Sequence, residues 1–183
     1  MTFQNALNIA PGTSGQLLTS AGSGSPASFA SAGVVSYFTA YASANISDVT
    51  GDGTAYTVVY PATLHNVGTN YGTGTGVFTA PETGYYLFTC VIWIYQPNAS
   101  GITSCNLKLV PSTGGYYNLW SGNPVPIRDV SNDAFTMGGS AIIPMNASST
   151  ISTVLTCSGG AKGVDIRGHG AVLFSYWQGM RLE

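Results

Sequence analysis

Residues 66–88 constrain the fold more than any other stretch, and they read NVGTNYGTGTGVFTAPETGYYLF. The glycine-rich residues 73–76 can adopt the positive φ angles that a tight hairpin turn requires. Pro81 fixes its own φ angle and lacks an N–H donor, so it ends the short strand that follows this turn. Gly84 closes the next turn, and the side chains alternate from Tyr85 onward as in a β-strand. The stretch therefore predicts a hairpin followed by a long strand.

The spacing within this stretch also resembles that of a known domain family. In the C1q-like globular domain, an Asn, an aromatic residue and a Phe precede the pattern Gly-x-Tyr-x-Phe. The matching positions here are Asn66, Tyr71, Phe78, Gly84, Tyr86 and Phe88. The resemblance implies the fold that this family shares with tumour necrosis factor, a ten-stranded antiparallel jelly-roll sandwich that packs as a trimer. Phe174 and Ser175 match the family's closing Phe-Ser-Gly, whereas Tyr176 replaces the glycine, which implies altered packing at the subunit contact.

The rest of the chain is patterned as strands separated by turns rich in Gly, Pro and Asn. No segment of useful length has a helical period. We therefore expect an all-β jelly roll over residues 34–183, after a short irregular N-terminal extension. The predicted strands outside the hairpin are residues 34–42, 55–60, 85–95, 103–110, 116–120, 134–143, 150–157 and 169–179. Residues 121–133 are predicted to form a loop.

The strand predicted at residues 85–95 is apolar on both faces. Tyr86, Phe88, Cys90, Ile92 and Ile94 point one way, and Tyr85, Leu87, Val91, Trp93 and Tyr95 point the other way. A strand that is apolar on both faces is covered on both faces. The partner sheet of a sandwich covers one of them. We expect a neighbouring subunit of a homotrimer to cover the other.

Charged residues are scarce, at 7% of the 183 residues, against roughly 25% in a typical soluble domain. Eleven Tyr and seven Phe supply core material, which argues against disorder in the main body. No basic patch is present to neutralise phosphates, so we expect no nucleic-acid partner. We also expect no membrane insertion, because no apolar run is long enough to span a bilayer. So few charges favour burial of surface between subunits.

Residues 1–33 are small, polar and without a clear pattern, which by composition alone predicts a flexible linker. The segment also resembles the Gly-x-x-Gly-Gln-x-Leu-Thr-Ser-x-Gly…Pro-x-Phe strings of bacteriophage tail-fibre and related virion proteins, which occur in other bacterial surface proteins too. The matching residues are Gly12, Gly15, Gln16, Leu18, Thr19, Ser20, Gly22, Pro26 and Phe29. This resemblance implies a stalk or attachment segment that docks to another virion protein. The first residues do not resemble a secretory signal peptide, which favours a phage particle over a bacterial extracellular or surface location.

No catalytic or cofactor motif is recognisable. The chain has no Gly-x-Ser-x-Gly elbow and no Walker loop, and its seven acidic residues do not identify a glycosidase carboxylate pair. Asp48 and Asp52 leave calcium binding open, but two carboxylates do not define a site. The odd number of cysteines, three, favours free buried thiols, with a Cys90–Cys105 pair across a hairpin as the alternative.

Binding is the function that remains. Aromatic residues lie in or beside predicted turns, where their rings can stack on sugars or on partner residues. These residues are Tyr95, Tyr116, Tyr117 and Trp120. Their alternative role is in the sandwich core or the trimer interface. We therefore expect a non-enzymatic virion fibre or decoration protein that binds a host surface glycan or protein. The alternatives are a purely structural virion joining protein, a polysaccharide depolymerase carried on a virion, and a bacterial C1q-like binding protein.

Overall fold

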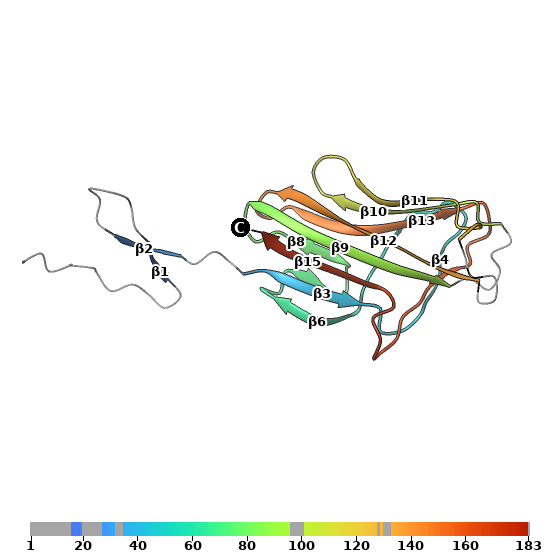
Figure 1. The fold of residues 1–183 in the computed structure, drawn as a ribbon, viewed down its shortest axis with the longest axis horizontal. Helices are drawn as coiled ribbons and strands as arrows, with labels where there is room; N and C mark the ends of the chain where they lie inside the picture. The colour runs from blue at the N-terminus through green and yellow to red at the C-terminus, as the bar shows by residue number, and fades with distance from the viewer. Residues whose placement is uncertain are drawn as a thin grey trace, which may run out of the picture. The chain divides into compact units, whose positions relative to one another are not determined.

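A computed structural model describes residues 16–19, 27–31, 35–95, 101–127, 129 and 133–182. The chain divides into two compact units, residues 1–34 and residues 35–183. The regular structure of the described residues is all β (Figure 1). The strands are β1 (Gln16–Thr19), β2 (Ser28–Ser31), β3 (Tyr37–Tyr41), β4 (Ile46–Thr50), β5 (Tyr56–Thr57), β6 (Ala62–Val67), β7 (Tyr71–Gly72), β8 (Val77–Thr79), β9 (Gly84–Tyr95), β10 (Ser104–Pro111), β11 (Tyr117–Gly122), β12 (Ala134–Met145), β13 (Thr150–Ser158), β14 (Val164–Ile166) and β15 (Tyr176–Leu182). The described residues include no helix that is long and apolar enough to cross a membrane.

The larger unit is a sandwich of two antiparallel sheets. One sheet has seven strands in the order β4-β14-β9-β15-β3-β6, with β12 also paired to β9. The other has six strands in the order β11-β10-β13-β8-β7, with β5 also paired to β13. Strand β9 organises the larger sheet, because β12 pairs with its whole length while β15 and β14 pair in turn with its other edge. The all-β jelly roll is thus confirmed. The described residues form more strands than the expected ten, seven in one sheet and six in the other, because short strands such as β5 and β7 are counted.

The core lies between the two sheets and is rich in aromatic rings. On β9 the residues predicted to share the inner face, Tyr86, Phe88, Cys90, Ile92 and Ile94, are all buried. Phe78 stacks on Phe38 with ring centroids 5.2 Å apart and meets Phe88 edge-on at 5.5 Å. Trp177 of β15 meets Phe38 edge-on at 4.9 Å. Each such pair contributes about 0.5–1.5 kcal/mol beyond the burial of its area.

The glycine-rich turn forms the predicted hairpin between β7 and β8. Tyr71 pairs with Phe78, and Gly72 pairs with Val77. The Gly72 carbonyl accepts the N–H groups of Thr75 at 3.2 Å and Gly76 at 2.8 Å. Gly76 has a φ of 69°, which an L side chain rarely adopts. A Cβ atom there would also lie 2.5 Å from the Val58 carbonyl oxygen, so this position requires glycine.

The closing strand begins later than the sequence predicts. Strand β15 is Tyr176–Leu182, whereas the expected strand covered residues 169–179. Residues 169–175 instead cross the end of the larger sheet, where Ser175 Oγ accepts the Trp93 N–H at 3.0 Å and the Ser175 carbonyl accepts the Ala42 N–H at 3.0 Å. Val172 and Leu173 are exposed. The apolar composition of this segment imitates a strand, but its backbone hydrogen bonds fix a bend.

The expectation of free thiols is wrong for two of the three cysteines. Cys105 and Cys157 form a disulfide, and they lie directly opposite each other on β10 and β13. The alternative Cys90–Cys105 pair is also wrong, because Cys90 is a free thiol buried on β9 of the other sheet. Its Sγ lies 3.2 Å from the Tyr60 hydroxyl. Cys105 and Cys157 are 52 residues apart in sequence, so no local pattern signals the pair.

In the smaller unit, β1 and β2 form an antiparallel hairpin in which Gln16 pairs with Ser31 and Leu18 pairs with Phe29. The Thr19 Oγ1 donates to the Ser28 carbonyl at 3.0 Å. The description of residues 1–33 as an irregular extension is therefore corrected for these two segments. The hairpin includes Gln16, Leu18, Thr19 and Phe29 of the phage-like string. The other matching residues of the string, Gly12, Gly15, Ser20, Gly22 and Pro26, lie outside the described residues.

Candidate functional site

The residues that carry the C1q-like spacing lie inside the sandwich or in its turns. Asn66 bridges the turn between β6 and β7, since its Nδ2 donates to the Tyr71 carbonyl at 2.9 Å and its Oδ1 accepts the Tyr71 N–H at 3.2 Å. The Tyr71 hydroxyl donates to the Tyr60 carbonyl at 3.1 Å and accepts the Tyr60 N–H at 3.0 Å. Burial raises the pKa of Tyr71 to about 12. Both residues therefore hold backbone turns in place.

The remaining positions of this spacing have similar structural roles. Phe78 and Phe88 are core residues, and the Tyr86 hydroxyl donates to the Glu82 carbonyl at 2.7 Å. Gly84 begins β9 and makes room for Arg181, because a Cβ atom at Gly84 would lie 3.2 Å from the Arg181 Nε. Arg181 in turn pairs with Glu82 at 2.7 Å. None of these side chains lines the cavities described below.

The outer face of the seven-stranded sheet carries an unusual pattern of side chains. Five apolar residues are in register across β6, β3, β15, β9 and β12, and we call them the apolar row: Val67, Tyr37, Met180, Leu87 and Ile142. Leu87 is half-buried, and the other four are between 39% and 57% exposed. The next register across the same strands is a polar row: His65, Thr39, Gln178, Thr89 and Ser140. The apolar row spans roughly 19 Å, given about 4.8 Å between neighbouring strands.

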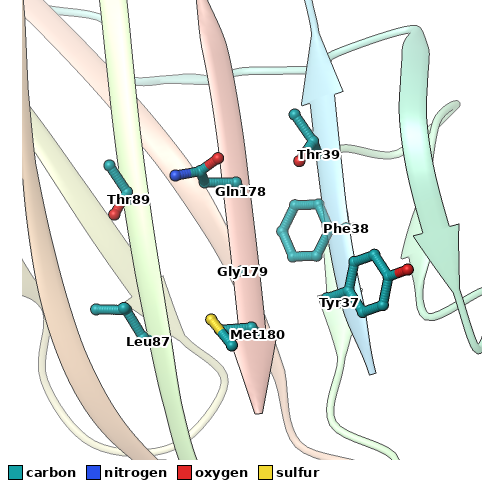
Figure 2. A pocket seen from close by; sticks show the side chains of 8 residues that line it. All are labelled: Tyr37, Phe38, Thr39, Leu87, Thr89, Gln178, Gly179 and Met180. Atoms are coloured by element: carbon teal, nitrogen blue, oxygen red, sulfur yellow. The ribbon is translucent and has the colours of Figure 1, made fainter. Parts of the chain in front are cut away.

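The two rows border a shallow cavity of about 230 Å³ over β3, β15 and β9. Figure 2 shows Thr89, Gln178 and Thr39 in one line and Leu87, Met180 and Tyr37 in the next. Phe38 and Gly179 complete the lining. The lining residues include no carboxylate, imidazole, amine or thiol, and their polar groups are the hydroxyls of Tyr37, Thr39 and Thr89 and the amide of Gln178. Such a surface is suited to contact with another apolar surface.

The four aromatic residues predicted to contact a receptor do not form one site. Tyr116 is 61% exposed beside β11, with the Lys108 Nζ 4.1 Å from its ring centroid. Tyr117 is also exposed, whereas Trp120 is half-buried and packs against Phe135 at 5.9 Å between ring centroids. Tyr95 ends β9, at the end of the sandwich opposite the turn between β10 and β11 (Figure 1).

Tyr95 lies instead in a second cavity, of about 440 Å³, with Asn45, Arg167, Gly168, His169 and Phe174. The sequence alone did not predict this group. These residues come from four separate parts of the chain, so no local motif joins them. The one sequence signal was the two-faced character of β9, which places Trp93 and Tyr95 on the outer face of the sheet.

Of the two aspartates considered for calcium, Asp52 has a local structural role through its carboxylate, whereas Asp48 is held through its backbone. Asp52 Oδ1 accepts the Thr54 N–H at 3.0 Å, and hydrogen bonds from Thr54 lower the pKa of Asp52. The backbone N–H of Asp48 donates to Asp165 Oδ1 at 2.8 Å. Within the described part of the chain, no group of three or more His, Cys, Asp or Glu residues is placed to hold a metal ion.

Comparison with solved structures places this sandwich among the C1q and tumour necrosis factor jelly rolls. The globular domain of zebrafish complement 1qA superposes with a TM-score of 0.55 at 10% identity, covering 81% of this chain and 98% of that domain. Murine APRIL gives 0.54 at 9% identity, covering 81% and 99%. Eiger TNF from S. frugiperda gives 0.51 at 14% identity, covering 82% and 92%. No protein-family model and no curated protein matches the sequence. Identities this low show a shared fold, and the chain has the C1q/TNF-like jelly-roll fold.

Proposed function

We propose that this C1q/TNF-like jelly roll is a non-enzymatic, homotrimeric fibre or decoration protein of a bacteriophage particle. In this proposal residues 1–33 dock to another virion protein, and the jelly roll faces outward and binds a glycan of the host surface. The observation that carries the proposal is the exposed apolar row, which supports assembly of the jelly roll. The phage-like string in residues 12–29 supports the location on a virion.

The apolar row supports a second copy of the chain as the occupant of this sheet face. Scattered exposed apolar residues are normal on a soluble domain, but a contiguous row across five neighbouring strands marks an interaction surface. The polar row beside it offers hydroxyl and amide groups that can pair across a symmetric interface. Because the chain carries few charges, an apolar contact between copies meets little electrostatic repulsion. A trimer assembled through the apolar row would cover the outer face of β9 near Leu87, at the Gly84 end of the strand.

The oligomeric state is tested by light scattering of the purified full-length chain at micromolar concentration. We expect the mass of three chains for the wild type. Met180→Asp places a charge in the middle of the apolar row and should give a folded monomer or a much weaker trimer. Val125→Asp changes an exposed apolar residue outside the apolar row, in the segment between β11 and β12, and should remain trimeric. A wild-type protein that stays monomeric would rule out the assembly.

Glycan binding is tested by applying the labelled protein to an array of bacterial surface glycans. Selective binding supports the receptor-binding role. Binding to no glycan, together with normal incorporation into particles, would favour the purely structural joining protein. Release of reducing sugar from a host polysaccharide would favour the depolymerase and contradict the non-enzymatic proposal.

A further inference from the structure

Arg167 is held in an unusual environment at the end of the larger sheet. Its guanidinium carbon lies 4.7 Å from the centroid of the Trp93 ring and 4.6 Å from that of Phe174. The two rings meet edge-on with centroids 4.8 Å apart. A cation within about 6 Å of an aromatic ring is attracted to its face. Stacking of this kind uses the charge of the guanidinium but none of its N–H donors.

Among the residues that the structure describes, none forms an ion pair with Arg167. Within the described residues, no carboxylate lies within ion-pair distance of its guanidinium, whereas Arg181 pairs with Glu82. The nearest acidic residue in sequence, Asp165, accepts hydrogen bonds from the Asp48 N–H at 2.8 Å and the Ser47 hydroxyl at 3.4 Å. The chain has only five Lys and Arg residues in total. Arg167, one of these five residues, is therefore held on the Trp93 and Phe174 rings, with its guanidinium N–H groups available to a ligand.

The neighbouring residues add further donors to the same cavity. Asn45 Oδ1 accepts the Gly168 N–H at 3.0 Å, which leaves the Asn45 Nδ2 group as a donor. His169 Nδ1 accepts the Ala171 N–H at 3.0 Å. A ring nitrogen that accepts a hydrogen bond carries no proton, so the neutral imidazole carries its proton on Nε2 and donates from there. The cavity thus combines a guanidinium, an amide and an imidazole N–H with the rings of Tyr95 and Phe174.

The backbone holds this arrangement in place. The Arg167 N–H donates to the Trp93 carbonyl at 2.8 Å, and the His169 N–H donates to the Ala42 carbonyl at 2.9 Å. At Gly168 a Cβ atom would collide with the Ala44 carbonyl, so only glycine lets the two segments approach this closely. Donors that are fixed before binding lose less conformational entropy when a ligand arrives.

We propose that this cavity binds the carboxylate of an acidic sugar, a uronate or a sialate, at the end of the sandwich. The planar guanidinium matches a carboxylate through two parallel N–H···O bonds. The Tyr95 and Phe174 rings provide apolar surface for the C–H face of a sugar ring. The acidic side chains of a peptide have no such face. The cavity volume of about 440 Å³ lies within the range of small-molecule sites, roughly 300–1,000 Å³. This inference rests on the proposed glycan-binding function and names its ligand class.

The experiment is calorimetric titration of the full-length protein with D-glucuronate and with N-acetylneuraminate, each in separate runs. The methyl ester of glucuronic acid serves as a ligand of the same shape without the charge. We expect both acids to bind and the ester to bind at least about tenfold more weakly. Arg167→Lys keeps the charge but loses the bidentate geometry and should also weaken binding about tenfold. Arg167→Gln should abolish it.

Lys108→Gln is the control, because it removes one positive charge and one cation–π contact on β10 of the other sheet, whereas Arg167→Gln removes one charge and two such contacts. Lys108→Gln should leave binding unchanged. If Arg167→Gln lowers the melting temperature, Asn45→Ala at an exposed position provides a second variant. It removes one cavity donor and one exposed hydrogen bond to the Gly168 N–H, so it should weaken binding while lowering the melting temperature only slightly.

Three results would overturn the inference: no binding of either acid by the folded wild type, equal binding of the ester, or equal loss in Lys108→Gln. Binding of a glutamate peptide as tightly as glucuronate would overturn the assignment to a sugar. Array binding to neutral glycans alone would refute the acidic site while leaving the proposed glycan-binding function intact.

Discussion

At the residue scale, Gly179 shows how tightly the core is packed. A Cβ atom at this position would lie 2.6 Å from the Phe38 Cε1 and 2.6 Å from two ring carbons of Phe88. Both rings are buried in the core, so they cannot move aside cheaply. We expect Gly179→Ala to lower the free energy of unfolding by about 1–3 kcal/mol, the usual cost of overpacking. Urea unfolding measures this change.

Gly115→Ala is the matched control for that substitution. No heavy atom lies within 4 Å of a Cβ built at Gly115, and the residue is exposed. Its unfolding free energy should stay within about 0.5 kcal/mol of the wild type. Equal stabilities of the two variants would show that the Phe38–Phe88 packing around Gly179 is looser than described.

A cluster of buried protonated groups predicts a loss of stability at high pH. Burial raises the pKa of Cys90 from 9.0 to about 12 and that of Tyr71 from 10.0 to about 12. Burial also raises the pKa of Tyr60 well above its usual value. The folded state therefore retains these protons more strongly than the unfolded chain, so this stabilisation is complete below pH 9 and is lost as the pH rises towards 12.

Urea unfolding at several pH values between 9 and about 12 measures the decline. Cys90→Ala should remove its earliest part, because the thiol has the lowest unfolded pKa of the three groups. An unfolding free energy that did not change over this range would contradict the burial of these groups.

At the element scale, the disulfide joins β10 and β13 in the middle of the six-stranded sheet. It closes a loop of 52 residues, and the entropy of such a loop in the unfolded chain predicts a stabilisation of about 4 kcal/mol. We expect the double variant Cys105→Ala, Cys157→Ala to lose about this amount in urea unfolding. Reductant should destabilise the wild type and leave the double variant unchanged. If reductant did not change the unfolding free energy of the wild type, the disulfide would not be formed in solution.

The elements that the sequence predicts well are those whose signals are local. The glycine turn before Val77 and the alternation along β9 follow from backbone freedom and side-chain period, and both are present in the structure. Strand β6 was largely missed, and the strand predicted at residues 55–60 is only Tyr56–Thr57. Strands β4 and β14 were also missed. Each is short, and β14 lies between Gly163 and Gly168 and pairs with β4 and the end of β9. Their strand character comes from these long-range pairs and not from composition.

The candidate sites were predicted less well, for the same physical reason. Tyr95 was chosen as an aromatic residue beside a turn, and it lines the acidic-sugar cavity proposed here. Arg167 and Phe174 were not chosen, because their contact with Trp93 depends on how residues 167–175 cross the sheet. That path differs from the strand that the sequence predicts for residues 169–179. Because residues 169–175 were predicted as part of a strand, the cavity that this segment helps to form was not predicted.

At the scale of the whole molecule, the apolar row and the Arg167 cavity lie at opposite ends of β9 in the larger unit. The apolar row runs across the strands at the Gly84 end of β9, where Leu87 pairs with Ile142 and Met180. The Arg167 cavity lies at the Tyr95 end of the same strand. Because the two are separated along β9, assembly through the apolar row leaves the cavity open. A trimer would then present three copies of the cavity, and multivalent contact strengthens weak sugar binding.

The last prediction concerns the division of labour between the two units. Residues 1–33 are rich in Gly, Ser and Thr, yet they carry more large apolar side chains than a pure spacer needs. These are Phe3, Leu7, Ile9, Leu17, Leu18 and Phe29. The described hairpin of this segment pairs only β1 with β2, and an isolated two-stranded hairpin is marginally stable in water. Such a segment gains stability against a partner or against its symmetry mates. We therefore expect it to be cut by protease in the free protein and protected in the particle.

Deletion of residues 1–33 tests the assignment directly. The truncated chain should remain a folded trimer, because the apolar row and the core belong to residues 35–183. It should also bind sugars as the full-length chain does, since the residues of the Arg167 cavity are all retained. It should fail to enter particles, as measured by its abundance in purified virions beside the full-length control. Normal incorporation of the truncated chain would mean that the jelly roll itself attaches to the particle.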